Sequence, residues 1–210
     1  MIADKVPSVE DLEGRFHFIA DDTLRRNIAL AFQHTIFLIA VLEEAGAEGS
    51  SIASSTHKDM ITQTSCVVEA CTHYVLAEYI RTGRAVSGDV MPKEEKYIDI
   101  KELYKVSSDE RILSVREIKK VERLHPRTQL QSLNKAALNA GVFDQDTFDK
   151  AEELRNTRNK MHLPGLSAID NTYSKEASNR AFEQARIIVE MIEAKLGELQ
   201  VVPVVVAEQQ

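Results

Sequence analysis

Apolar residues recur at intervals of three and four over most of this chain, the spacing that places them on one face of an α-helix. Capping residues and glycines divide the pattern: Asp21-Asp22 precedes the first long segment, and Gly46 ends it. Five helices are therefore predicted, with a loop rich in Gly, Ser and Ala between the first two. The helices cover 22–46, 54–81, 128–140, a segment that follows Asp144 and ends at Pro164, and 174–196, and the loop covers 46–56.

The helical spacing breaks between residues 84 and 126. Two strand-like runs, 97–101 and 111–115, flank the turn-like sequence Ser107-Ser108-Asp109. They predict a small β-hairpin or irregular insertion around 90–120, a natural place for partner or substrate specificity. The expected fold class is all-α: a single domain over 1–200, built as a bundle of about five helices around this insertion. The tail at 201–210 is interrupted by proline and is expected to be disordered.

The last turns of the fourth predicted helix carry an unusual set of polar side chains. Solvated helix faces usually carry Glu and Lys, whereas guanidinium, amide and imidazole groups suit phosphate binding and acid–base chemistry. At about 100° per residue, four of these side chains share an arc of roughly 100°, and a fifth lies to one side. The four are Arg155, Arg158, Asn159 and His162, and the fifth is Asn156.

A structural explanation also fits part of this pattern. Cations in the last turn of a helix are stabilised by the helix dipole, and Pro164-Gly165 is a suitable stop. That explanation does not account for two Arg-Asn pairs three residues apart with a histidine on the same face.

The run Leu-Arg-Asn-Thr-Arg-Asn-Lys-Met-His-Leu at 154–163 resembles the signature of HEPN domains, a group of small all-helical proteins. The signature is an Arg, usually followed by a polar residue, with a His roughly four to six residues further on. Six residues separate Arg155 from His162, the long edge of that spacing, and three separate Arg158 from His162, which is too short. The sequence leaves open which Arg-Asn pair matches. The order of predicted elements also fits the family over roughly 20–200.

The resemblance implies a function at this face. Many HEPN proteins are metal-independent endoribonucleases of defence and toxin–antitoxin systems, and others are binding or assembly modules without catalysis. A catalytic site would use His162 to move the proton of the RNA 2′-OH or of the leaving oxygen. Arg155 and Arg158 would stabilise the phosphate charge, while Asn156 and Asn159 would bind substrate. Because one histidine per chain is few for two proton transfers, we expect a homodimer whose axis runs near His162.

Composition restricts how this chain could bind RNA. The net charge is -7, aromatic residues are 6 % and Trp is absent, which argues against a uniformly basic surface or a base-stacking platform. RNA would therefore need a local basic patch, and residues 111–127 offer one, although a mixed solvated face is the alternative. The cations there are Arg111, Arg116, Lys119, Lys120, Arg123, His125 and Arg127, against Glu117 and Glu122.

The cysteines and the remaining histidines have unremarkable interpretations. Cys66 and Cys71 would point about 140° apart on a helix, so neither a disulfide nor a shared metal is expected, and both are predicted to be buried structural thiols. No metal and no cofactor are predicted, and no role is given to the histidines outside the motif: His34 and His73 within helices, and His17, His57 and His125 near element ends.

The sequence also predicts partners and a cellular location. The longest apolar run, within 36–42, is too short to cross a membrane, and the N-terminus turns polar at once. A cytoplasmic protein without a membrane partner is predicted. RNA is the expected ligand, and a toxin would also have a silencing antitoxin or defence-system partner.

Overall fold

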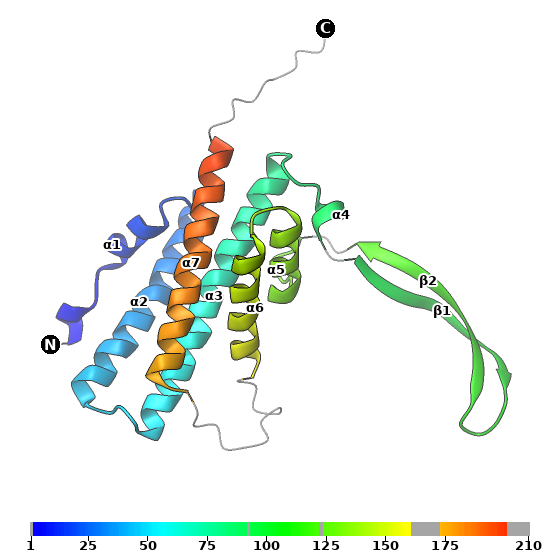
Figure 1. Cartoon of the computed structure of the whole chain (residues 1–210), viewed down its shortest axis with the longest axis horizontal. Helices are drawn as coiled ribbons and strands as arrows, with labels where there is room; N and C mark the ends of the chain where they lie inside the picture. The colour runs from blue at the N-terminus through cyan, green and yellow to red at the C-terminus, as the bar shows by residue number, and fades with distance from the viewer. Residues whose placement is uncertain (1, 92, 122–123, 161–172, 201–210) are drawn as a thin grey trace, which may run out of the picture.

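The computed structural model shows a helical bundle from which a long β-hairpin projects (Figure 1). It describes residues 2–91, 93–121, 124–160 and 173–200. The predicted mostly helical fold with a small two-stranded sheet is confirmed within these residues. In chain order the elements are η1 (Ile2–Lys5), α1 (Val9–Glu13), η2 (Gly14–Phe16), α2 (Asp22–Ala45), α3 (Ser51–Arg81), α4 (Ser87–Val90), β1 (Lys93–Lys105), β2 (Arg111–Val121), α5 (Leu130–Asn139), α6 (Gln145–Asn159) and α7 (Lys175–Gln200).

Local caps set the helix boundaries. Gly46 ends α2 in the left-handed conformation, at φ 57°, which a residue without a Cβ adopts at no steric cost. The Ser50 hydroxyl then accepts a hydrogen bond from the Ala53 N–H at 3.1 Å and starts α3. The predicted start at Ser54 is therefore wrong by three residues, because Ser50 is the cap and the loop is correspondingly shorter.

α3 is the central helix of the bundle and packs against α2, α5, α6 and α7. Three small hydroxyl residues lie on its buried face, and each donates to the carbonyl four residues earlier at 2.8 to 2.9 Å, so none needs a partner from another helix. Each large apolar side chain buried here contributes about 1.5–3 kcal/mol. The hydroxyl residues are Thr64, Ser65 and Thr72, and the most buried large apolar residues are Met60, Ile61, Val68, Val75 and Leu76.

The hairpin is longer than the sequence predicted. Its antiparallel register runs from Lys93 opposite Val121 to Lys105 opposite Arg111. Two register shifts each add one residue to β1, and Asp99 sits at the first of them with φ 53°. At the base of the hairpin, the Asn139 amide of α5 donates to the Val90 carbonyl at 2.9 Å, so the bundle closes beneath the insertion.

α2 bears on the expectation that the protein lacks a membrane partner. By length and composition alone this helix suffices to cross a bilayer, a property that buried helices of many non-membrane proteins share. Only 28 % of its apolar window is buried, and Leu30 and Phe37 are among its exposed residues. The absence of a membrane partner and the cytoplasmic location therefore stay predictions.

Candidate functional site

α6 carries the predicted site and is fixed to the bundle by one apolar face. The Asp144 carboxylate accepts a hydrogen bond from the Thr147 N–H at 2.8 Å, which starts the helix and lowers the pKa of Asp144. Ala151 and Leu154 are buried against the core. The helix ends at Asn159 with Lys160 as its C-cap, five residues before the predicted stop at Pro164. The rest of the predicted helix lies outside the described residues. His162 itself lies outside them.

Three elements meet around a cavity of about 570 Å³ at the C-terminal end of α6. We call it the arginine pocket. Three of the predicted residues line it together: Arg155, Arg158 and Asn159. The fourth described one, Asn156, lies beside the pocket, as the helical geometry predicted. The remaining lining residues are Glu69 from α3, and Arg127, Thr128, Gln129, Leu130 and Gln131 from the turn before α5 and its first residues.

Arg158 is paired across the pocket. Its Nη1 donates to Glu69 Oε2 at 3.1 Å, which joins the end of α6 to the middle of α3. Both side chains keep roughly a third of their surface exposed, so a ligand in the pocket can reach the guanidinium. Within the described residues its Nε and Nη2 make no hydrogen bond.

Arg155 is held more firmly. Its Nε and Nη2 donate to the Glu152 carboxylate at 2.8 to 3.0 Å, and its Nη2 also donates to Asn156 Oδ1 at 2.9 Å. The buried amide of Asn134 donates to Glu152 from the other side at 2.8 Å. Asn156 therefore orients Arg155 and does not line the pocket. The sequence had suggested that Asn156 binds substrate.

A turn at the base of the hairpin adds a cation that the sequence analysis did not assign to this site. The Thr128 N–H donates to the His125 carbonyl at 2.8 Å around Pro126, and this turn makes Arg127 part of the pocket lining. The Arg127 N–H donates to His125 Nδ1 at 3.1 Å, so a neutral His125 carries its proton on Nε2. Pro126 is the sequence signal for this turn, because it fixes the backbone at that position.

The charge of the arginine pocket is positive but modest. Three guanidinium groups line it against the Glu69 carboxylate, and Glu152 neutralises Arg155 from behind. Arg127 has no ion pair among the described residues. Of the other cations in the basic segment, Arg111 and Arg116 lie on the hairpin, outside the pocket lining.

The prediction of two buried thiols is half wrong. Cys71 is buried, and burial raises its pKa to about 12. Cys66 is exposed beside the arginine pocket. Partial burial raises the pKa of its thiol, while Arg158 opposes that effect and Glu69 reinforces it. Among the described residues, no group of three or more His, Cys, Asp or Glu side chains is arranged to hold a metal ion.

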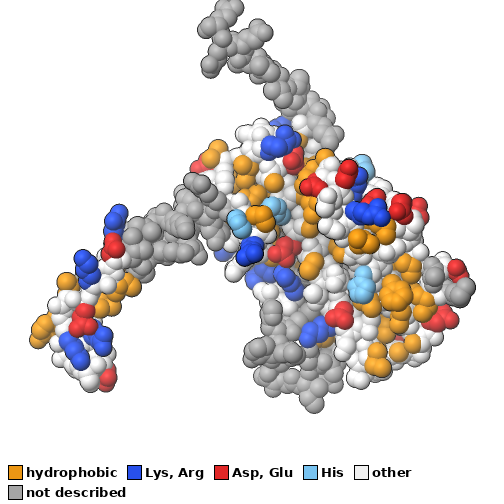
Figure 2. Space-filling model, turned by 180° about the vertical axis from the view of Figure 1, so that it is seen from behind, with side chains coloured by type: hydrophobic (Ala, Val, Ile, Leu, Met, Phe, Trp, Pro, Cys, Tyr) orange, Lys and Arg blue, Asp and Glu red, His pale blue; other side chains and the backbone are white. Residues whose placement is uncertain are grey.

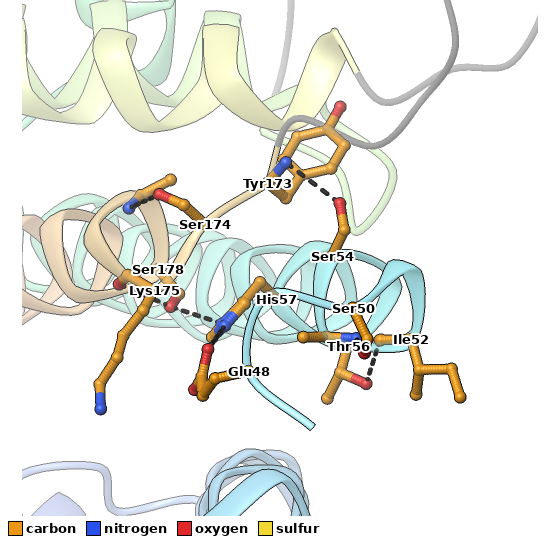
Figure 3. A network of polar contacts seen from close by, with 12 residues as sticks. Glu48, Ser50, Ile52, Ser54, Thr56, His57, Tyr173, Ser174, Lys175 and Ser178 are labelled. Carbon is orange, nitrogen blue, oxygen red and sulfur yellow. Dashed lines mark hydrogen bonds and ion pairs between the residues drawn. The ribbon is translucent and has the colours of Figure 1, made fainter. Parts of the chain in front are cut away.

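A second polar cluster joins α3 to α7 (Figure 3). Ser178 Oγ lies 3.0 Å from His57 Nδ1, and Glu48 Oε2 lies 3.4 Å from His57 Nε2. The residue types are those of a hydrolytic triad, but Ser178 and His57 are only 3 % and 4 % exposed, and the serine hydroxyl also donates to the Lys175 carbonyl. No substrate can reach this hydroxyl, so we assign the cluster a structural role. His57 thus lies buried in the second turn of α3, near the start of the helix as expected, and it has a structural role that the sequence did not assign.

The chain matches no protein-family model, no curated protein and no solved structure. The HEPN resemblance therefore depends on the motif at 154–163 and on the order of the predicted elements.

Proposed function

We propose that this protein binds RNA phosphate in the arginine pocket and cleaves the RNA without a metal ion, as a HEPN-like endoribonuclease. One observation supports this most directly: Arg127, Arg155, Arg158 and Asn159, from distant parts of the chain, line one cavity. His162 follows the last of them by three positions in the sequence. Guanidinium groups are the preferred donors for phosphate oxygens, and a cavity of this size suits one nucleotide.

Each pocket residue has a role in this proposal. Arg127 and Arg158 hold the phosphate and stabilise its additional negative charge as the 2′-oxygen attacks phosphorus. Glu152 and Asn156 fix the Arg155 guanidinium, so it contributes charge from a set position. His162 takes the proton of the 2′-hydroxyl or gives one to the departing 5′-oxygen.

The proposed context extends this reaction. A homodimer with its axis near His162 would supply a second histidine, so that one acts as base and the other as acid. A cytoplasmic toxin of this kind would require an antitoxin or defence-system partner. Neither the dimer nor the partner is needed for RNA to enter the pocket of one chain.

The ion pairs favour a second candidate, a module that binds RNA or a nucleotide without turnover. Glu69 and Glu152 already neutralise Arg158 and Arg155, at 3.1 Å and 2.8 Å. An incoming phosphate must compete with both carboxylates, which reduces the charge available to stabilise a transition state.

One experiment separates the candidates. Total RNA is incubated in EDTA with the wild type, His162→Ala, Arg158→Ala and the control Arg81→Ala, which removes an ion-paired arginine of α3 outside this pocket. Cleavage that persists in the wild type and the control, and is lost in His162→Ala, supports the ribonuclease. RNA binding without cleavage, weakened only by Arg158→Ala, supports the binding module. If the wild type neither cleaves nor binds RNA, both proposals are wrong and the arginines only hold the helices together.

A further inference from the structure

The projecting hairpin carries apolar side chains that no other described part of the chain covers. Six of them expose 48–65 % of their surface. Figure 2 shows hydrophobic side chains along this arm, which extends away from the bundle. The two strands pair with each other, and neither packs extensively on a helix within the described residues. An isolated two-stranded ribbon is marginally stable in water, so this arm is suited to a surface that covers it. The six are Ile100, Leu103, Tyr104, Ile112, Leu113 and Val115.

The bundle offers a matching surface on another face. A groove of about 650 Å³ runs between α2, α3 and α7, and we call it the apolar groove. Charged side chains line its edge, with three carboxylates against Arg15 and Arg186. Arg186 is already engaged by two of the carboxylates, at 2.5 and 2.6 Å. The apolar lining includes Phe16, Phe32, Ile36, Ile39, Phe182 and Val189, and the three carboxylates are Glu183, Glu190 and Glu193.

The excess charges of β2 and of the groove edge are opposite in sign, although the hairpin from Lys93 to Val121 carries eight cations against seven carboxylates in all. β2 places Ile112, Leu113 and Val115 between Arg111 and Arg116. Both arginines are exposed, and each already faces a carboxylate of β1, Glu102 at 3.2 Å and Asp99 at 3.9 Å, with which a partner would compete. Over the whole strand four cations stand against one carboxylate. The groove has the inverse arrangement, an apolar lining with an excess of carboxylate at its edge.

The arm and the groove also match in length. The groove follows α7 from Asn179 to Glu193, about 21 Å along a helix. The segment from Arg111 to Arg116 spans about 17 Å in a strand.

The arm cannot occupy the groove of its own chain. The hairpin leaves the bundle beside α4 and α5, whereas α2, which forms one wall of the groove, lies on the opposite side (Figure 1). Within the described residues the arm and the groove thus both stay uncovered, and a second copy of the chain can bring them together. Reciprocal exchange around a two-fold axis would satisfy both.

We propose that the hairpin of one copy docks into the apolar groove of a second copy, with the Arg111–Arg116 segment of β2 along α7. This contact does not depend on the proposed RNA function, and it involves other surfaces than the arginine pocket.

The test measures the mass of the full chain in solution by light scattering during gel filtration. Leu113→Ser/Val115→Ser removes exposed apolar surface from the arm, and Ile52→Ser/Val86→Ser removes comparably exposed surface from the bundle as a control. The control should keep the wild-type mass. The arm variant should have half that mass, with association weakened roughly tenfold or more. Ile36→Asp places a charge in the groove and should have the same effect.

Mixing the two deficient proteins is the decisive step. An Ile36→Asp subunit keeps an intact arm, and the arm variant keeps an intact groove, so the mixture should form pairs that neither protein forms alone. The proposal is wrong if the wild type and the arm variant have equal masses. It is also wrong if the arm variant keeps the wild-type mass but has lost RNA binding. Loss of association in the arm variant without recovery on mixing would also overturn it, in favour of hairpin-to-hairpin pairing.

Discussion

Arg158 and Glu69 lie 89 positions apart in the sequence, and their side chains meet at 3.1 Å to join the last turn of α6 to the middle of α3. With 32 % and 30 % of their side chains exposed, solvent screens the pair, and it contributes about 0–1 kcal/mol to stability. Its larger effect is on the arginine pocket, where Glu69 offsets one of the three guanidinium charges.

Replacing Glu69 with Gln should therefore strengthen RNA binding. The variant frees the Arg158 guanidinium, and we expect binding about two- to fivefold tighter, with a steeper salt dependence. Stability should change by less than about 1 kcal/mol. Fluorescence anisotropy with a short labelled RNA, at several salt concentrations, measures the effect. Glu78→Gln is the control, since Glu78 pairs with Arg81 on the same helix and does not line the pocket. Unchanged or weaker binding by Glu69→Gln would contradict the proposed role of the pocket.

Glu152 should contribute more to stability than Glu153, the next residue in the sequence. Its removal by Glu152→Ala leaves the buried amide of Asn134 without its acceptor and Arg155 without its carboxylate. We expect the free energy of unfolding to fall by about 1–3 kcal/mol in urea titrations. Glu153→Ala removes a more exposed carboxylate that lies 3.6 Å from Arg180, and should cost about 0.5 kcal/mol or less. Equal losses of unfolding free energy in the two variants would show that the contacts of Glu152 with Asn134 and Arg155 add no more stability than the exposed ion pair of Glu153.

The cluster around His57 should stabilise the fold without affecting the arginine pocket. In His57→Ala, Ser178 and Glu48 lose their shared partner, and α7 loses a polar tie to α3. The expected loss is about 1–3 kcal/mol of unfolding free energy, seen as a lower midpoint in thermal or urea unfolding. RNA binding by the folded fraction should match the wild type. His34→Ala, at an exposed position of α2, is the control and should leave both quantities unchanged.

Cys66 should report on the charge of the arginine pocket. Arg158 opposes the rise in the pKa of this thiol, so Arg158→Gln should raise that pKa further and leave less thiolate at neutral pH. Alkylation of Cys66 by iodoacetamide should then be slower in the variant near pH 8, and the two rates should converge at high pH. A faster reaction in Arg158→Gln than in the wild type would show that access, and not charge, controls this thiol.

Cys71 provides the internal reference in that experiment. Its thiol is buried and has a pKa of about 12, so it should react only after the chain unfolds. Mass spectrometry of the native protein should therefore find one modified cysteine, and two after denaturation.

The helices could be predicted from the sequence because their signals are local. The three- and four-residue spacing of apolar side chains and caps such as Asp21 and Asp144 act within one or two turns. The sequence places the end of α6 too late, because its local stop signal is Pro164-Gly165 whereas the helix ends at Asn159. The prediction that Cys66 and Cys71 are both buried was wrong for Cys66. The predicted angle of about 140° between them already argued against it, because two side chains so far apart on one helix rarely share its buried face.

The site was only partly predictable for a different reason. One helix turn brings Arg155, Arg158 and Asn159 together, which the helical spacing revealed. Glu69 and Arg127 reach the same cavity through the packing of α3 and through the turn at Pro126, and no local pattern encodes which distant side chains will meet. The carboxylates that neutralise the arginines were therefore unforeseen, and they decide how much charge the pocket offers.

The hydrogen bond from Asn139 to Val90 has a consequence for how this protein can change over evolutionary time. It closes the bundle on both sides of the hairpin, so the core has no need of the arm for its own packing. Substitutions in β1 and β2 can therefore change the surface of the arm while α3, α5 and α6 keep the arginine pocket intact. We expect sequence variation among homologues to concentrate in the arm.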